Sequence, residues 1–75
     1  MSETTVRSPL KAMVWKIEVE AGQSVDEHDD LVILESMKTE IPVQASTGGT
    51  VKEILVKEGD SVEEDQPIAI LLAAT

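Results

Sequence analysis

Cysteine is absent from this chain of 75 residues, and Trp15 is its only aromatic residue. Without cysteine the protein can form neither a disulfide framework nor a thiolate zinc site. Its core must therefore be built from Val, Ile, Leu, Met and Ala. A domain of this size buries only ~60% of the surface that its unfolded chain exposes, so we expect one small core and no deep substrate cleft.

Basic residues are also scarce. Six Lys and Arg oppose fifteen Asp and Glu, which gives a net charge of -9 with His28 neutral. Nucleic acids and anionic membranes bind through basic patches, so this balance argues against both as partners. The longest apolar run, 68–74, is too short to cross a bilayer, and residues 1–5 lack the pattern of a signal peptide. We expect a single cytoplasmic domain over residues 1–75, acting as a monomer.

The chain contains an internal repeat with a shift of 37 residues. Nine of 22 positions are identical when Val14–Glu35 is laid over Val51–Leu72. One copy is too short to bury its own apolar face, whereas two copies facing each other can do so. The repeat halves, about 6–37 and 43–74, therefore predict pseudo-two-fold symmetry. Lys38 lies at the midpoint, so the symmetry would place it at one end and residues 1 and 75 together at the other.

The elements of each half have the pattern of β-strands. Apolar and charged residues alternate at period two in the segments that precede Gly22 and Gly59, as in half-buried strands. We expect both glycines in turns with positive φ. Short strands separated by frequent turns predict an all-β fold, either a small sandwich or a flattened barrel.

The middle of the chain has the pattern of a β-hairpin. Apolar segments 32–34 and 41–43 flank a polar tip centred on Met37 and Lys38. A two-residue hairpin turn requires positive φ and normally contains a pair such as Asn-Gly. Met-Lys is a poor pair for that backbone, which suggests that these side chains serve a task other than folding.

This segment resembles a known modification motif. Glu35-Ser36-Met37-Lys38 is similar to the attachment motif of biotinyl/lipoyl attachment domains, and the resemblance covers roughly residues 6–72. Other residues in keeping with that family are Ser8, Pro9, Leu10, Trp15, Lys16, Ile17, Gly22, Val25, Leu34, Gly59 and Asp60. The resemblance implies a flattened β-barrel of two four-stranded antiparallel sheets, with the modified lysine on an exposed hairpin turn. The pattern is most similar to stand-alone bacterial biotinyl/lipoyl attachment proteins.

Three positions bear on the type of carrier. Met37, before the lysine, is typical of biotin domains, whereas lipoyl domains usually have Asp there. Thr39 follows the lysine where biotin domains most often have Met, and a small residue is closer to the lipoyl pattern. Ala12 stands where the first half of family members often has Gly, while Gly49 keeps that residue in the second half.

The resemblance implies that Lys38 is covalently biotinylated by a biotin protein ligase, with Glu35, Ser36, Met37 and Thr39 contributing to recognition. Biotin would then carry CO2 as carboxybiotin from a biotin carboxylase to a carboxyltransferase. The chain itself would be a carrier and not an enzyme, because one His and no Cys offer no nucleophile–base pair. Two alternatives are a lipoyl carrier modified at Lys38 and an unmodified interaction barrel.

Two features near the tip have competing interpretations. Glu35 and Glu40 flank it symmetrically, either as a solvated acidic pair or as a pair that repels wrong partners. Trp15 shares the period-two parity of Ile17. We expect Trp15 to be partly buried near a rim rather than to anchor a partner.

Two acidic stretches superficially resemble metal sites. Residues 26–30 and their repeat counterpart, 63–67, are interpreted as acidic turns instead, because a hard cation requires a defined cage of oxygen ligands. His28 and Asp65 occupy positions where the family commonly has Gly. We expect positive φ at both and no bound metal.

Overall fold

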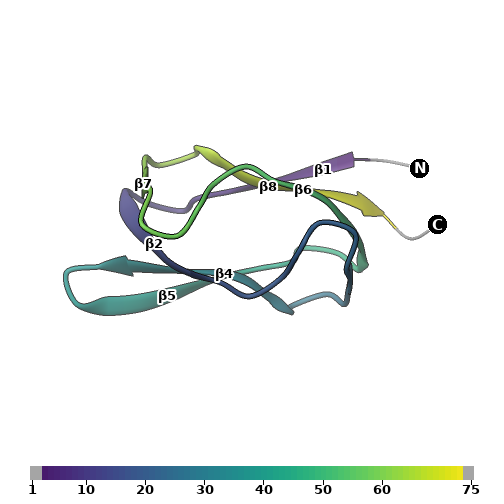
Figure 1. The fold of residues 1–75 in the computed structure, drawn as a ribbon, viewed down its shortest axis with the longest axis horizontal. Helices are drawn as coiled ribbons and strands as arrows, with labels where there is room; N and C mark the ends of the chain where they lie inside the picture. The colour runs from purple at the N-terminus through teal and green to yellow at the C-terminus, as the bar shows by residue number, and fades with distance from the viewer. Residues whose placement is uncertain (1–2, 74–75) are drawn as a thin grey trace.

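The structure is a computed structural model that describes residues 3–73, and its regular elements there are all β-strands. The strands are β1 (Glu3–Arg7), β2 (Ala12–Ile17), β3 (Ser24–Val25), β4 (Asp30–Ser36), β5 (Thr39–Gln44), β6 (Gly49–Ile54), β7 (Ser61–Val62) and β8 (Pro67–Ala73). They form two four-stranded antiparallel sheets, ordered β1-β8-β6-β3 and β5-β4-β2-β7. The two sheets face each other in Figure 1. The predicted all-β fold is confirmed.

The two halves of the chain are related by pseudo-two-fold symmetry, as predicted. If each strand is replaced by its repeat counterpart, β1 by β5, β2 by β6, β3 by β7, β4 by β8 and the reverse, the order of one sheet becomes the order of the other. The loop hydrogen bonds follow the same rule. The amide of Val14 donates to the carbonyl oxygen of Asp60 over 2.8 Å. Its counterpart 37 residues on, the amide of Val51, donates to the carbonyl oxygen of Gln23 over the same 2.8 Å.

The core between the sheets is aliphatic. Leu31 and Leu34 of β4 are fully buried, and so are their repeat counterparts Ile68 and Leu71 of β8. Each such side chain contributes roughly 1.5–3 kcal/mol when it is removed from water. The remaining buried hydrophobic residues are Val6, Val14, Val19, Val25, Val32, Val43, Ala45, Val51, Val56, Val62 and Ala69. Both sheets contribute to this core, so it holds the long hairpin strand β4 in place.

A β-bulge interrupts the period-two pattern of β2. The register with β4 shifts between Val14 and Lys16, and the register of β6 with β8 shifts at the equivalent place. Because a bulge inserts one residue into the ladder, Val14 and Ile17 both face the core. The expected parity of Trp15 with Ile17 is therefore wrong. Trp15 is one of the exposed large hydrophobic residues, with 51% of its surface accessible, so the expectation of a partly buried residue near a rim is not met.

The two ends of the described chain lie side by side. Glu3 of β1 pairs with Leu72 of β8, and this end of the molecule is opposite the β4–β5 turn in Figure 1. Residues 1 and 75, which the symmetry is expected to bring together, lie outside the described residues. Within residues 3–73 no helix is long and apolar enough to cross a membrane.

The turns have the backbone that the sequence predicts. The values of φ are 92° and 93° at Gly22 and Gly59, 74° at His28 and 68° at Asp65. In the first acidic turn, a carboxylate oxygen of Asp29 accepts a hydrogen bond of 2.8 Å from the amide of Asp26. The described residues contain no group of three or more His, Cys, Asp or Glu side chains that could hold a metal ion. The hydrogen bond from Asp26 to Asp29 supports the interpretation of residues 26–30 as a turn.

Substitutions at His28 test this interpretation. His28→Gly should change stability by zero to about 1 kcal/mol in the stabilising direction, because glycine removes backbone strain but raises the entropy of the unfolded chain. His28→Val should lower the melting temperature clearly, since a β-branched residue fits positive φ worst. Thermal unfolding measures both, and the same pair of changes at Asp65 is the matched control. A wild-type melting temperature that falls on adding a chelator, with no such fall in His28→Gly, would contradict a simple turn.

Candidate functional site

The hairpin of β4 and β5 ends in a two-residue turn at one end of the molecule (Figure 1). Its last two ladder pairs are Glu35 with Glu40 and Ser36 with Thr39. Met37 and Lys38 alone connect them, with φ of 51° and 66°. Positive φ at both central residues is the mirror-image turn geometry that matches the twist of hairpin strands. The predicted turn is confirmed, and its backbone conformation is one that neither Met nor Lys favours.

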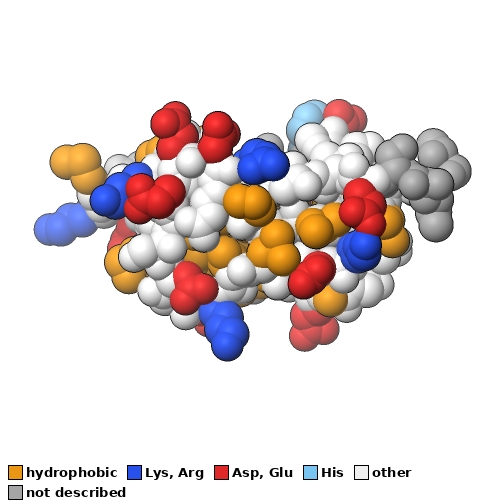
Figure 2. All heavy atoms as spheres, turned by 90° about the horizontal axis from the view of Figure 1, so that it is seen from above, with side chains coloured by type: hydrophobic (Ala, Val, Ile, Leu, Met, Phe, Trp, Pro, Cys, Tyr) orange, Lys and Arg blue, Asp and Glu red, His pale blue; other side chains and the backbone are white. Residues whose placement is uncertain are grey.

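Both turn residues face solvent. Met37 is 94% exposed, and Lys38 is exposed as well. Figure 2 shows one hydrophobic and one basic side chain projecting beyond the rest of the surface at this end. The side chain of Met37 gains almost no burial, so it does not fill the core. Recognition by a partner remains as the interpretation of Met37.

The amine of Lys38 is not held by a neighbouring carboxylate. Within residues 3–73 the lysine ion pairs are Lys11–Glu63 at 3.9 Å, Lys16–Glu18 at 3.6 Å and Lys52–Glu3. The hydrogen bond to Glu3 raises the pKa of Lys52 above its ordinary value. Lys38 takes part in no such pair in this part of the chain. Its amine can therefore enter the active site of another protein without breaking an internal contact.

Two carboxylates flank the turn. Glu35 and Glu40 are both exposed and stand directly opposite each other on neighbouring strands. Like charges in this arrangement destabilise a sheet, and neither residue has an ion-pair partner among the residues that the structure describes. The predicted symmetric position of this pair is confirmed. The geometry is consistent with both interpretations of the pair, as solvated surface carboxylates and as charges that repel wrong partner proteins.

One strand pair found in the other half of the molecule is missing between β2 and the hairpin strand β4. β6 pairs with β8 as far as Gly49 and Ala73, whereas the equivalent pair of Ala12 with Ser36 is not formed in the described chain. A Cβ on Gly49 would lie 2.0 Å from the carbonyl oxygen of Leu72, so only glycine permits that approach. Ala12 carries this Cβ. The sequence shows the Gly-to-Ala difference, but its effect on pairing becomes visible only in the structure.

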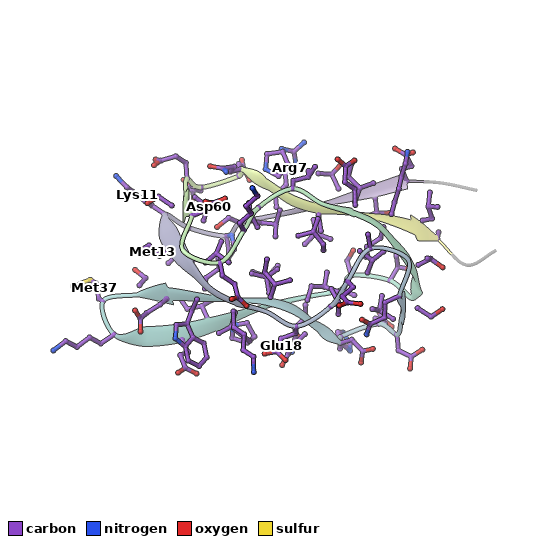
Figure 3. The ribbon with its side chains drawn as sticks, viewed as in Figure 1. Arg7, Lys11, Met13, Glu18, Met37 and Asp60 are labelled. Carbon is purple, nitrogen blue, oxygen red and sulfur yellow. The ribbon has the colours of Figure 1, made fainter. Side chains whose placement is uncertain are left out.

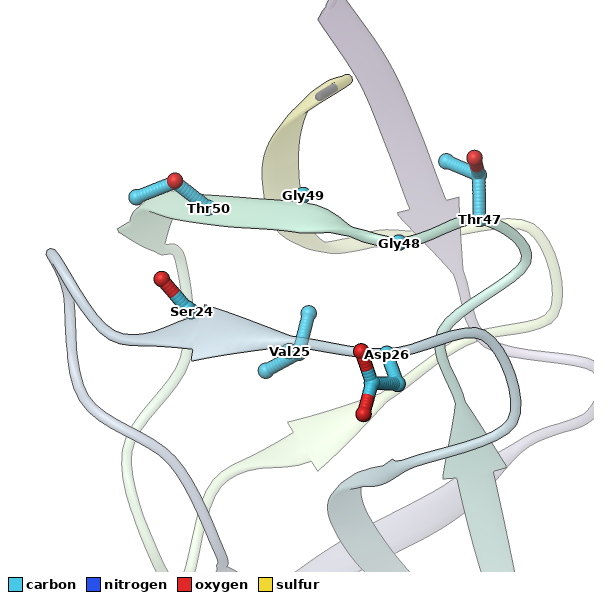
Figure 4. Close-up of a pocket in the computed structure, with 7 residues that line it drawn as sticks. All are labelled: Ser24, Val25, Asp26, Thr47, Gly48, Gly49 and Thr50. Carbon is cyan, nitrogen blue, oxygen red and sulfur yellow. The ribbon is translucent and has the colours of Figure 1, made fainter. Parts of the chain in front are cut away.

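A shallow hollow lies near the opposite end of the molecule, and Figure 4 shows its residues. Its volume is about 460 Å³. It is lined by Ser24, Val25, Asp26, Thr47, Gly48, Gly49 and Thr50. The repeat counterparts of Thr47 and Gly48 are Leu10 and Lys11, and Leu10 packs against the core. The hollow therefore arises where small residues replace larger ones. It offers hydroxyls and one carboxylate but no nucleophile–base pair.

Comparison with known proteins assigns the family. The family model described as "Biotin-requiring enzyme" matches residues 3–71. The chain belongs to the biotin/lipoyl attachment family. A biotin/lipoyl attachment protein of Bacillus subtilis is 41% identical over 71 residues, which cover 95% of this chain and 97% of that protein. The biotin carboxyl carrier protein of acetyl-CoA carboxylase from Haemophilus influenzae is 37% identical over 78 residues, covering 95% of this chain and 50% of that protein.

The fold is shared with a domain of a much larger protein. The urea carboxylase of Kluyveromyces lactis superposes with a TM-score of 0.90 and 33% identity. The match covers 96% of this chain but only 6% of the carboxylase. The resemblance found in the sequence and the expected fold are thus confirmed. The family description and the carboxyl carrier relative also support the prediction of a biotin-type carrier. The assignment of Lys38, Met37, Glu35, Ser36 and Thr39 to the site stays a prediction.

Proposed function

We propose that this chain is one attachment domain that carries biotin covalently on Lys38. The observation that supports this most strongly is the position of an exposed, unpaired lysine at the tip of a two-residue turn, in a chain of the biotin/lipoyl family. An attachment site requires an amine on a long stem that another enzyme can reach. A turn between two paired strands supplies exposure and a defined position together.

The attachment reaction needs little from the carrier. A lysine amine is protonated in neutral solution, so a biotin protein ligase must first remove that proton. The amine nitrogen of Lys38 then attacks the acyl carbon of biotinyl-adenylate, an amide bond forms and AMP leaves. The product amide is neutral, so the protein becomes more negative by one charge. Glu35, Ser36, Met37 and Thr39 flank Lys38 along the hairpin and would contribute to recognition by the ligase.

After attachment, we propose a role as a non-catalytic carrier. The chain would present carboxybiotin alternately to a biotin carboxylase and to a carboxyltransferase. Its contribution is tethering, which raises the local concentration of the reacting group without any new contact. The cytoplasmic location and the monomeric state stay predictions. Intact mass after co-expression with a biotin protein ligase, together with an avidin blot, tests the proposal.

A lipoyl carrier is the alternative function, and the residues beside Lys38 distinguish the two. Met37→Asp should slow biotinylation strongly and could make the turn a substrate of lipoate ligase, because Asp is the usual residue there in lipoyl domains. Thr39→Met should leave the rate equal or faster. Initial rates of labelling measured by mass spectrometry compare both variants with the wild type. Unchanged biotinylation of Met37→Asp would show that the ligase reads the fold rather than this side chain.

A further inference from the structure

Most of the large hydrophobic side chains that the structure exposes lie on β2 or at the turn. In the described part of the chain they are Met13 at 50%, Trp15 at 51%, Met37 at 94% and Leu55 at 40%. Figure 3 shows Met13 and Met37 at the same end of the molecule. Only Leu55 belongs to the other half. Exposed apolar side chains that gather in one place mark an interaction site more often than scattered ones do.

The strand register shows which residues share this surface. Directly opposed residues of a sheet point to the same face. Met13 is opposite Glu35, so both lie on the outer face of the sheet. Trp15 is the additional residue of the bulge, next to Lys16, which pairs with Ile33; the partner of Ile33 on β5 is Pro42. We call Met13, Trp15, Ile33 and Pro42 the β2 face.

The pseudo-symmetry provides an internal control for this face. The residues at the equivalent positions of the other sheet are Thr50, Lys52, Ile70 and Thr5, all on strands with the same pairing. Three of these four counterparts are polar, and the second sheet folds with them. Folding therefore does not require a hydrophobic residue at positions 13, 15 and 42. Trp and Met are residue types enriched at protein interfaces.

We propose that the β2 face is the contact surface for the biotin protein ligase that acylates Lys38; this rests on the proposed function. Ile33, which pairs with Lys16 next to Trp15, is five residues from Lys38, or ~16 Å along the strand at ~3.3 Å per residue. A standard interface of ~800 Å² per partner has a radius of ~16 Å, so a contact centred on the turn reaches Trp15. An unmodified lysine is short, and the ligase must therefore approach the hairpin closely.

The charges beside the β2 face define the chemistry of the ligase surface. Glu35 and Glu40 share a cross-strand row with Met13, two residues closer to the turn than Ile33 and Pro42. Neither glutamate has a cationic partner in the described chain. The whole chain carries a net charge of -9. A complementary surface has an apolar recess for Trp15 with Lys or Arg side chains placed to meet the two glutamates. Such a partner would also relieve the repulsion between Glu35 and Glu40.

A double variant that borrows the residues of the other half tests the β2 face. Met13→Thr with Trp15→Lys introduces the side chains found at the equivalent positions 50 and 52. The KM for the ligase should rise about tenfold or more, the expected loss for an interface anchor, while kcat and the final extent of labelling stay unchanged. Thermal unfolding verifies the fold. Leu55→Glu, which copies Glu18 from the equivalent position, is the matched control and should leave KM unchanged.

Each other result contradicts the proposal. Wild-type KM in the double variant, or an equal rise in Leu55→Glu, would show that the β2 face has no specific role. Normal biotinylation with impaired carboxyl transfer would assign the face to a carboxylase component. A wild-type dimer in sedimentation that the double variant disperses would assign it to a second copy of the chain. A wild type that no biotin ligase labels at Lys38 overturns both the proposed function and this inference.

Discussion

Lys38→Arg should abolish biotinylation completely and leave thermal unfolding unchanged. Arginine keeps the positive charge and a long stem, but its guanidinium stays protonated and cannot act as the attacking amine. The side chain at this position is exposed and has no internal ion pair to lose. Intact mass after co-expression with a biotin protein ligase should show one biotinyl group on the wild type and none on the variant.

The remaining lysines are internal controls for this result. They are Lys11, Lys16, Lys52 and Lys57. If the ligase acylates only the lysine of the turn, none of them should be labelled in either protein, and peptide mapping should find biotin on Lys38 alone. Labelling of any of the four in Lys38→Arg would contradict the assignment. Faster modification of the wild type by a lipoate ligase than by a biotin ligase would favour the lipoyl alternative.

Gly49→Ala should destabilise the fold by about 3 kcal/mol, at the upper end of the usual cost of overpacking. The new Cβ would lie 2.0 Å from the carbonyl oxygen of Leu72, so β6 and β8 must separate where Gly49 now pairs with Ala73. For a domain of this size the melting temperature should fall by roughly 12 °C or more. Urea unfolding and thermal melts both measure the change.

The neighbouring glycine supplies the matched control. A Cβ on Gly48 would approach no atom closer than 3.5 Å, so Gly48→Ala should change stability by less than about 1 kcal/mol. Ala12→Gly removes the Cβ at the equivalent place in the other half and should also have a small effect. If Gly49→Ala unfolds at the wild-type temperature, the strands can separate there without cost. The explanation of the missing Ala12–Ser36 pair would then be wrong.

The features that the sequence predicts are those encoded by residue type at fixed positions. Gly22 and Gly59 mark turns because their positive φ suits glycine, and the shift of 37 residues between them reveals the symmetry. The turn at Met37 and Lys38 follows from the apolar segments on either side. Each of these inferences depends on short segments and on their repetition along the chain. The need of two half-cores to cover each other predicts that the halves face each other, whereas the strand order is known only from the structure.

The features that the sequence does not predict depend on how strands meet. The bulge in β2 turns Trp15 to the opposite face of the sheet from Ile17. An alternating pattern of apolar and polar residues does not reveal where such an extra residue is inserted. The absent pair of Ala12 with Ser36 depends on an approach distance between strands distant in sequence. The β2 face requires the register of three strands to be known. The sequence contains one sign of this face. Met13 and Trp15 have polar repeat counterparts 37 residues later, Thr50 and Lys52.

The pairing of β1 with β8 sets the distance between the ends of the described chain and the β4–β5 turn. Both ends of the described chain emerge at one pole, and the β4–β5 turn occupies the other, in a molecule 38 Å long and 17 Å across. A protein that holds the domain by either end keeps the pivot a full domain length from Lys38. A small rotation at the pivot then becomes a large sweep of the amine. The length of the domain therefore adds to the distance over which the Lys38 side chain alone could move its amine.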